Sequence, residues 1–127
     1  MLISHLDHLV LTVADIKKTC SFYSEALGMT AITFGDNRTA LSFGEQKINI
    51  HPAHSPLMPH AKNPAPGSAD ICLITKLPLA SVMHHLQGKG VVIELGPVFR
   101  TGAVGAIESI YFRDPDGNLI EVGKYGG

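Results

Sequence analysis

The stretch Asp114-Pro115-Asp116-Gly117-Asn118-Leu119-Ile120-Glu121-Val122 decides the fold of this chain. Asp-Pro-Asp-Gly is typical of a tight turn, and the residues after it predict a strand with one carboxylate, Glu121, between apolar neighbours. We expect residues 108–113 and 118–124 to form a β-hairpin around this turn. Earlier in the chain, Ile48-Asn49-Ile50 matches Ile120-Glu121-Val122, which makes Asn49 the counterpart of Glu121 in an internal repeat.

The two halves of the repeat also begin alike. Asp7-His8-Leu9-Val10-Leu11-Thr12 opens the first half, and Ala69-Asp70-Ile71-Cys72-Leu73-Ile74 opens the second, with Asp70 in the place of His8. A half of about sixty residues would be marginally stable alone, so the two halves should share a core. We therefore expect residues 1–127 to form a single domain of two βαβββ modules.

Turn and helix signals set the expected boundaries of the two modules, residues 3–60 and 68–125. In the first we expect a strand over 5–13, a helix from Asp15 to Gly28, and strands over 29–35, 38–43 and 46–51. In the second we expect a strand over 69–75, a helix from Pro78 to Gly88 or Gly90, a strand over 91–95 and a glycine-rich loop over 97–105. The proline-rich residues 52–68 form the linker and are long enough to fold over a site as a lid. The predicted class is α+β.

The composition excludes several classes of function. The chain is 45% hydrophobic and 17% charged with a net charge of -1, and it has no basic patch for nucleic acid or an anionic membrane. No signal peptide or membrane-spanning stretch is visible. Cys20 and Cys72 do not make a disulfide framework. We expect a cytoplasmic protein with reduced thiols and a small-molecule partner.

Four residues on strands are candidate ligands of a divalent metal. By strand alternation His8, Asp70 and Glu121 share equivalent faces, and His51 shares the face of Asn49. Buried carboxylates are costly unless they are paired or bound to metal, and a divalent ion would neutralise both Asp70 and Glu121. Histidine mixed with carboxylates suits Zn, Ni, Mn, Fe or Co.

Each candidate ligand also has an ordinary structural interpretation. Glu121 could form a salt bridge with Arg113 or Arg100 at a rim. His8 could be a core histidine bonded to backbone, and Asp70 could cap a turn. His51 begins the proline-rich linker, so it could equally be a solvated loop histidine.

The chain resembles the vicinal oxygen chelate superfamily, which includes glyoxalase I, extradiol dioxygenases and bleomycin-resistance proteins. The resemblance rests on three motifs: Asp7 to Val13, Phe22-Tyr23 with Leu27-Gly28-Met29, and Tyr111 to Glu121. Residues 47–51 and 102–105 look closest to the subgroup called glyoxalase-domain-containing protein 5 or bacterial virulence-protein homologues. The resemblance implies paired βαβββ modules, a cupped mixed sheet and a metal in a cleft, with His8 and Glu121 as ligands. Asp70 falls where many members carry a histidine, and Asn49 falls where glyoxalase I carries a glutamate.

The departure at Asn49 shapes the expected function. An amide cannot act as a base, so Glu121 or His51, with an ordinary pKa of about 6.5, would have to move a proton. We expect a metal-dependent lyase or isomerase, or next a dioxygenase, whose substrate binds the metal through two neighbouring oxygens. Arg100 or Arg113 would hold a substrate anion, and Asn49 would contact substrate. The alternative is a metal-free protein that sequesters a ligand, as bleomycin-resistance members do. Open sheet edges predict a homodimer.

Overall fold

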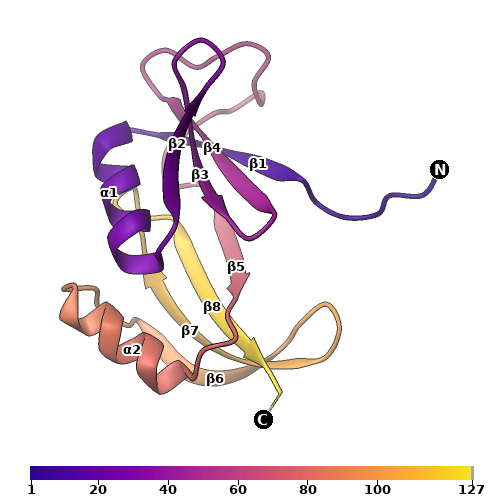
Figure 1. Cartoon of the computed structure of the whole chain (residues 1–127), viewed down its shortest axis with the longest axis vertical. Coiled ribbons are helices and arrows are strands. Elements are labelled where there is room, and N and C mark those ends of the chain that lie inside the picture. Colours follow the sequence, from indigo (N-terminus) through magenta and orange to yellow (C-terminus); the bar gives the residue numbers. More distant parts are fainter. Residues whose placement is uncertain (127) are drawn as a thin grey trace. The chain divides into compact units, whose positions relative to one another are not determined.

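The structure is a computed structural model that describes residues 1–126. Its elements follow the order β-α-β-β-β twice (Figure 1). The first set is β1 (His8–Val13), α1 (Ile16–Leu27), β2 (Thr30–Phe34), β3 (Arg38–Phe43) and β4 (Gln46–Pro52). The second set is β5 (Asp70–Ile74), α2 (Leu79–Gly88), β6 (Leu95–Thr101), β7 (Ala106–Arg113) and β8 (Leu119–Tyr125). The predicted α+β class and the βαβββ order are confirmed.

The chain divides into two compact units, Met1–Gly67 and Ser68–Gly127, and each holds one four-stranded mixed sheet. The strand order is β1-β4-β3-β2 in the first unit and β5-β8-β7-β6 in the second. In each unit the first strand runs parallel to the last, and the other pairs are antiparallel. Neither helix in the described part of the chain is both long and apolar enough to cross a membrane.

Strand register gives a direct test of the internal repeat. His8 pairs with Lys47, two residues before Asn49, and Asp70 pairs with Leu119, two residues before Glu121. The offset is identical in the two parallel pairs. The predicted equivalences of His8 with Asp70 and of Asn49 with Glu121 are therefore confirmed.

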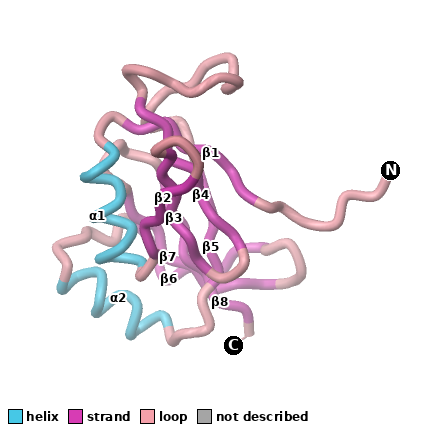
Figure 2. The backbone as a smooth tube through the Cα atoms, turned by 45° about the horizontal axis from the view of Figure 1, so that its top comes forward, coloured by secondary structure: helices cyan, strands magenta, loops and turns pink. Residues whose placement is uncertain are grey.

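Helix α1 begins and ends where the sequence predicts. The Asp15 side chain accepts a hydrogen bond from the Lys18 backbone N–H at 3.0 Å, which caps the first turn. Gly28 ends the helix with φ at 67°, a left-handed conformation that glycine adopts without steric cost. Tyr23 and Ala26 on this helix are buried, and Figure 2 shows α1 alongside the strands of its own unit.

Alternation along the strands separates an apolar face from a polar face in each sheet. In the first unit, the buried row includes Leu11, Val13, Leu41, Ile48 and Ile50. In the second, it includes Ile110, Phe112, Ile120 and Val122. We call the opposite side of each sheet its polar face, because His8, Asn49 and His51 lie there in the first unit and Asp70 and Glu121 in the second.

One predicted strand is misplaced. Residues 91–94 form no regular element, and the strand expected at 91–95 is instead β6, which covers much of the expected loop. The register between β6 and β7 shifts between Leu95 and Val98, where Gly96 has φ at 112°. A Cβ at Gly96 would lie 2.5 Å from the Ser109 carbonyl oxygen. Glycine and proline here mark a bulge in an edge strand, where a missing N–H donor is tolerated, and not a loop.

Candidate functional site

His8 lies at the start of β1 with its ring held by the preceding residue. Its Nδ1 donates to the Asp7 carboxylate at 2.8 Å, and its side chain is 42% exposed. The same hydrogen bond holds the pKa of Asp7 below its ordinary value. The alternative of a core histidine bonded to backbone is therefore wrong. A neutral imidazole that donates from Nδ1 keeps a lone pair on Nε2 for a ligand, as in metal sites where a carboxylate orients a histidine.

Asn49 and His51 are neighbours on the polar face of β4. Each residue is only 8% exposed. Within residues 1–126, neither the Asn49 Oδ1 nor the His51 Nδ1 has a hydrogen-bond partner. His51 is thus no solvated loop histidine. A buried polar atom without a partner costs about 1–3 kcal/mol, so these two atoms mark a place where a ligand would be stabilising.

The surroundings of His51 are positively charged. Burial lowers the pKa of His51 below its ordinary value, and Arg38 and His60 lower it further. Arg38 on β3 lies opposite His51 on β4, because the residues adjacent to them, Thr39 and Ile50, are partners in the antiparallel register. Neither Arg38 nor His60 was predicted to be a site residue. The alternation of β3 could have placed Arg38 on the polar face, but nothing in the sequence brings the linker residue His60 close to β4.

Asp70, Cys72 and Glu121 form the corresponding cluster in the second unit. Cys72 pairs with Glu121 in the β5–β8 register. Burial raises the pKa of the Cys72 thiol to about 11, with further contributions from Glu121 and Asp70, so both carboxylates lie near the sulfur.

The prediction that these two carboxylates are buried is wrong. Asp70 is exposed and Glu121 is half-buried, while its neighbours Ile120 and Val122 are buried. Alternation turns the carboxylates away from the apolar row, so the core does not force them to bind metal. The Asp70 side chain makes no hydrogen bond within residues 1–126, and the turn-capping alternative is also wrong.

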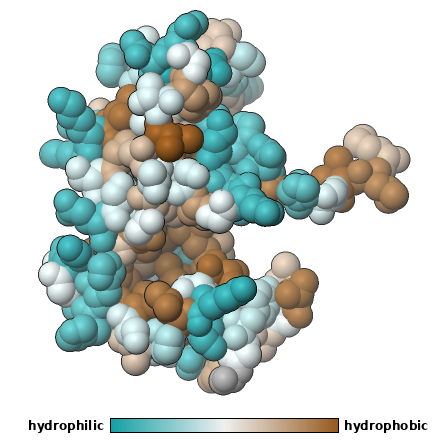
Figure 3. All heavy atoms as spheres, in the orientation of Figure 1, coloured by the Kyte–Doolittle hydropathy of each residue, from teal (hydrophilic) through white to brown (hydrophobic). Residues whose placement is uncertain are grey.

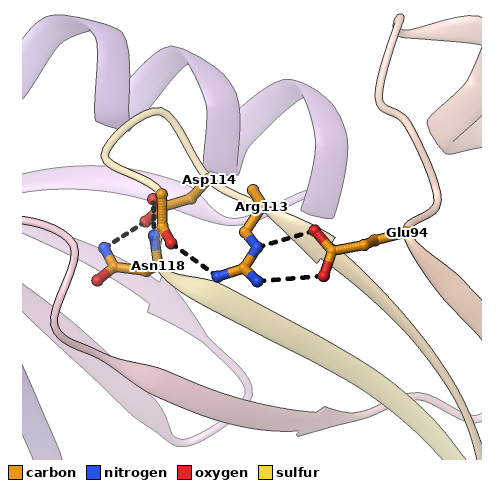
Figure 4. Close-up of polar contacts among 5 residues, drawn as sticks. Glu94, Arg113, Asp114 and Asn118 are labelled. Atoms are coloured by element: carbon orange, nitrogen blue, oxygen red, sulfur yellow. Dashed lines mark hydrogen bonds and ion pairs between the residues drawn. The ribbon is translucent and has the colours of Figure 1, made fainter.

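The two predicted substrate arginines already have partners. Arg113 donates two hydrogen bonds to Glu94, at 3.0 and 3.1 Å, and a third to the Gly117 carbonyl at 3.2 Å (Figure 4). Arg100 donates from Nε to the Tyr111 hydroxyl at 3.0 Å. In the described part of the chain neither pairs with Glu121, so the salt-bridge alternative for Glu121 is wrong. Arg100 also donates from Nη1 to the Phe99 carbonyl at 3.1 Å, so it uses two of its five N–H donors, whereas Arg113 uses three.

The turn after β7 fixes the strands that carry the two carboxylates. Asp114 Oδ1 accepts from the backbone N–H groups of Asp116 and Asn118, at 2.9 and 3.0 Å, and Oδ2 accepts from the Asn118 amide at 2.7 Å (Figure 4). Asn118 Oδ1 in turn accepts from the Ala69 N–H at 2.8 Å. One network therefore joins the start of β8, which carries Glu121, to the start of β5, which carries Asp70.

The donor chemistry of these residues fits a divalent metal, although the geometry is not preformed. Among residues 1–126, no three His, Cys, Asp or Glu side chains are arranged to hold an ion. His8 nevertheless offers a free Nε2, and neither Asp70 nor Glu121 forms an ion pair in that range. Nitrogen and carboxylate ligands of this kind suit Zn, Ni, Mn, Fe or Co.

Comparison with known proteins identifies a family across nearly the whole chain. Residues 5–122 match the Glyoxalase/Bleomycin resistance protein/Dioxygenase superfamily. Virulence protein STM3117 of Salmonella typhimurium is 54% identical over 98% of this chain and 87% of its own. Its crystal structure superposes with a TM-score of 0.97 over 99% and 100% of the two chains. A protein from the mobile metagenome of V. Pseudocholerae gives a TM-score of 0.98 at 58% identity, over 100% and 98%.

A more distant relative carries an activity in its name. Glutathione transferase FosA of Serratia marcescens is 29% identical over 95% of this chain and 81% of its own.

Proposed function

Since the chain belongs to the Glyoxalase/Bleomycin resistance protein/Dioxygenase superfamily, we propose that it is a metal-dependent enzyme acting on a small metabolite with two neighbouring oxygen atoms. A lyase or isomerase reaction leads, and a dioxygenase reaction comes next. The observation that carries the proposal is the hydrogen bonding of the two ring nitrogens of His8. Its Nδ1 is bound to Asp7 and its Nε2 is free on a partly exposed face, which is the arrangement of a metal-binding histidine.

The proposed protein ligands are His8, Asp70 and Glu121. A third ligand could come from Asp70 or His51, and charge favours Asp70. Arg38 and His60 surround His51 with positive charge, which disfavours a cation there. Asp70 and Glu121 instead bring two negative charges to one cluster. The ion, when bound, would act as a Lewis acid toward the substrate oxygens.

The remaining polar residues would bind the substrate or accept a proton from it. The lowered pKa of His51 keeps its imidazole neutral near pH 7, so it or Glu121 would accept the proton beside a carbonyl. Asn49 would contact a substrate oxygen or hydroxyl through its unpartnered amide. Arg100 would hold a substrate anion with its free donors, whereas Arg113 would first have to leave Glu94.

Metal analysis tests the proposal directly. Protein purified without a chelator or an affinity tag should contain a divalent metal near one ion per chain. Glu121→Gln preserves the shape of the side chain and His8→Ala removes the nitrogen, and each should weaken metal binding about tenfold or more. The double variant should lose less affinity than the product of the two single losses, because the two side chains are proposed to bind the same ion. His84→Ala, at an exposed helix position, is the control. Equal metal affinity in all variants would refute the ligand assignment.

A metal-free binding protein is the second candidate. The two buried atoms without partners, Asn49 Oδ1 and His51 Nδ1, suit the capture of a polar ligand and need no metal. Asn49 in place of a glutamate also removes one general base. Absence of bound metal, together with wild-type ligand binding by Glu121→Gln, would favour this function over the enzyme.

We further propose that the protein is a cytoplasmic homodimer. Its two cysteines are free thiols. The N-terminal segment projects from its unit (Figure 1), and its outer end is apolar (Figure 3), with Met1, Leu2 and Ile3 at least 80% exposed. Covering such side chains with a second copy would remove apolar surface from water. Light scattering that gives the monomer mass of 13.6 kDa at micromolar concentration would contradict the dimer.

A further inference from the structure

The polar face of the first unit gathers cations that the proposed function leaves unused. Lys47 stretches from β4 until its Nζ lies 3.8 Å from the centre of the Phe34 ring on β2. Phe34 is the register partner of Arg38 on β3. The ammonium group therefore ends beside the strand position that carries the guanidinium, and the two positive groups share one face.

In the described part of the chain, neither cation of this pair is held by a carboxylate in an ion pair. Within residues 1–126, Arg38 and Lys47 form no ion pair, although like charges are usually interleaved with acids on a protein surface. Of the nearby acids, Asp7 is bonded to His8 and attracts Lys47 only at longer range, and Asp36 and Glu45 lie in exposed turns. His60 adds a third basic group, with its Nδ1 held by the Ala61 carbonyl at 2.8 Å.

The two buried atoms without partners lie on the same face of the sheet as these cations. Arg38 lies across from His51, and Asn49 lies two residues from His51 on the same face. Both residues are more than nine-tenths buried, and each keeps one polar atom unbonded in the described part of the chain. A ligand could supply the donor that Asn49 Oδ1 lacks, because no group within residues 1–126 donates a hydrogen bond to this oxygen.

We propose that Arg38 and Lys47 form a subsite for the oxyanion group of a small hydroxylated ligand, such as a carboxylate or phosphate next to a hydroxyl. The guanidinium and ammonium bind the oxyanion by charge-assisted hydrogen bonds. The Asn49 carbonyl accepts a hydrogen bond from the neighbouring hydroxyl. The subsite rests on the proposed function and deepens it, because it assigns the substrate anion to Arg38 and Lys47 of the first unit in place of Arg100 or Arg113.

Anion binding to protein stripped of metal tests the subsite apart from the metal site. The probes are glycolate, acetate and inorganic phosphate, titrated at constant ionic strength and followed by backbone amide shifts. Glycolate and phosphate should shift amides in β3 and β4, and glycolate should bind more tightly than acetate. Arg38→Gln and Lys47→Gln should each weaken binding about tenfold, the effect of losing one charge-assisted bond. Asn49→Ala should remove the preference for glycolate over acetate.

Matched variants decide between the subsite and general surface charge. Lys17→Gln removes the same charge from exposed helix α1 and should leave binding unchanged. Arg113→Gln should also leave it unchanged, because its guanidinium is bound to Glu94. Equal binding by wild type and Arg38→Gln, or equal losses in Arg38→Gln and Lys17→Gln, would overturn the proposal. If the protein binds glycolate but no metal, the proposed metal-dependent enzyme is refuted and the anion subsite is supported.

Discussion

Replacing Asp114 with alanine should destabilise the protein by about 2–5 kcal/mol. The carboxylate is 6% exposed and accepts three hydrogen bonds, two of them from Asn118, which is 1% exposed. In the variant, the Asn118 backbone N–H and side-chain amide lose their acceptor while they stay buried. Each such donor costs about 1–3 kcal/mol, and the Asp116 N–H adds little because water can reach it. The Asn118 amide cannot compensate by turning over, since its Oδ1 accepts from Ala69.

Urea unfolding followed by circular dichroism measures this loss. The midpoint should fall while the slope stays unchanged, because the surface exposed on unfolding is the same. Asp36→Ala is the matched control: Asp36 also lies in a hairpin turn but is exposed, so its replacement should change stability by less than about 0.5 kcal/mol. A loss below about 1 kcal/mol for Asp114→Ala, or equal losses in the two variants, would show that the network does not hold the β7–β8 turn.

Two further predictions concern titratable groups. Glu121→Gln should lower the pKa of Cys72 from about 11 and so speed its alkylation near neutral pH, whereas Cys20, whose pKa is raised by burial alone, should label at an unchanged rate. Site-resolved mass spectrometry measures both alkylation rates. An unchanged rate at Cys72 would show that the Glu121 carboxylate does not raise the pKa of this thiol. Because the pKa of His51 is lowered on folding, the unfolded chain binds the extra proton, and stability should fall as pH drops below the ordinary value of 6.5. His51→Gln should make urea midpoints less sensitive to pH between about 5 and 7, and the same pH dependence in both proteins would contradict the assignment.

The sequence predicted most of the fold because local chemistry and periodicity agree there. Asp15 and Gly28 cap α1 as expected, and the turn at Asp114 joins two strands as expected. The repeat could be recognised because two separate matches, His8 with Asp70 and Asn49 with Glu121, agree with one strand register. The error at β6 arose because Gly96 and Pro97 signal a break, and only the approach of Ser109 shows that they serve a bulge.

The candidate site was harder to predict from the sequence, because the interactions of each side chain depend on partners that are distant in the sequence. Arg113 was expected to hold substrate, yet Glu94, in a segment predicted to be a strand, takes its guanidinium. Arg38 was not considered, although it stands across from His51. Alternation told which face a residue occupies, but it could not tell whether that face was apolar or polar. That is why Glu121 and Asp70 were wrongly expected to be buried.

The repeat also explains how one chain could carry both a metal site and an anion site. At equivalent positions the first unit has His8, Asn49 and His51, and the second has Asp70, Glu121 and Gly123. The partner of Gly123 on β7 is Ser109, whereas the residue across from His51 on β3 is Arg38. A side chain at Gly123 is excluded, because a Cβ would lie 2.9 Å from the Ser109 Oγ. The second unit therefore cannot hold a counterpart of His51 without rearrangement, and two acids accumulate there while bases accumulate in the first. Divergence of this kind gives the second unit the two proposed acidic ligands, and it gives the first unit the proposed anion subsite beside the proposed ligand His8.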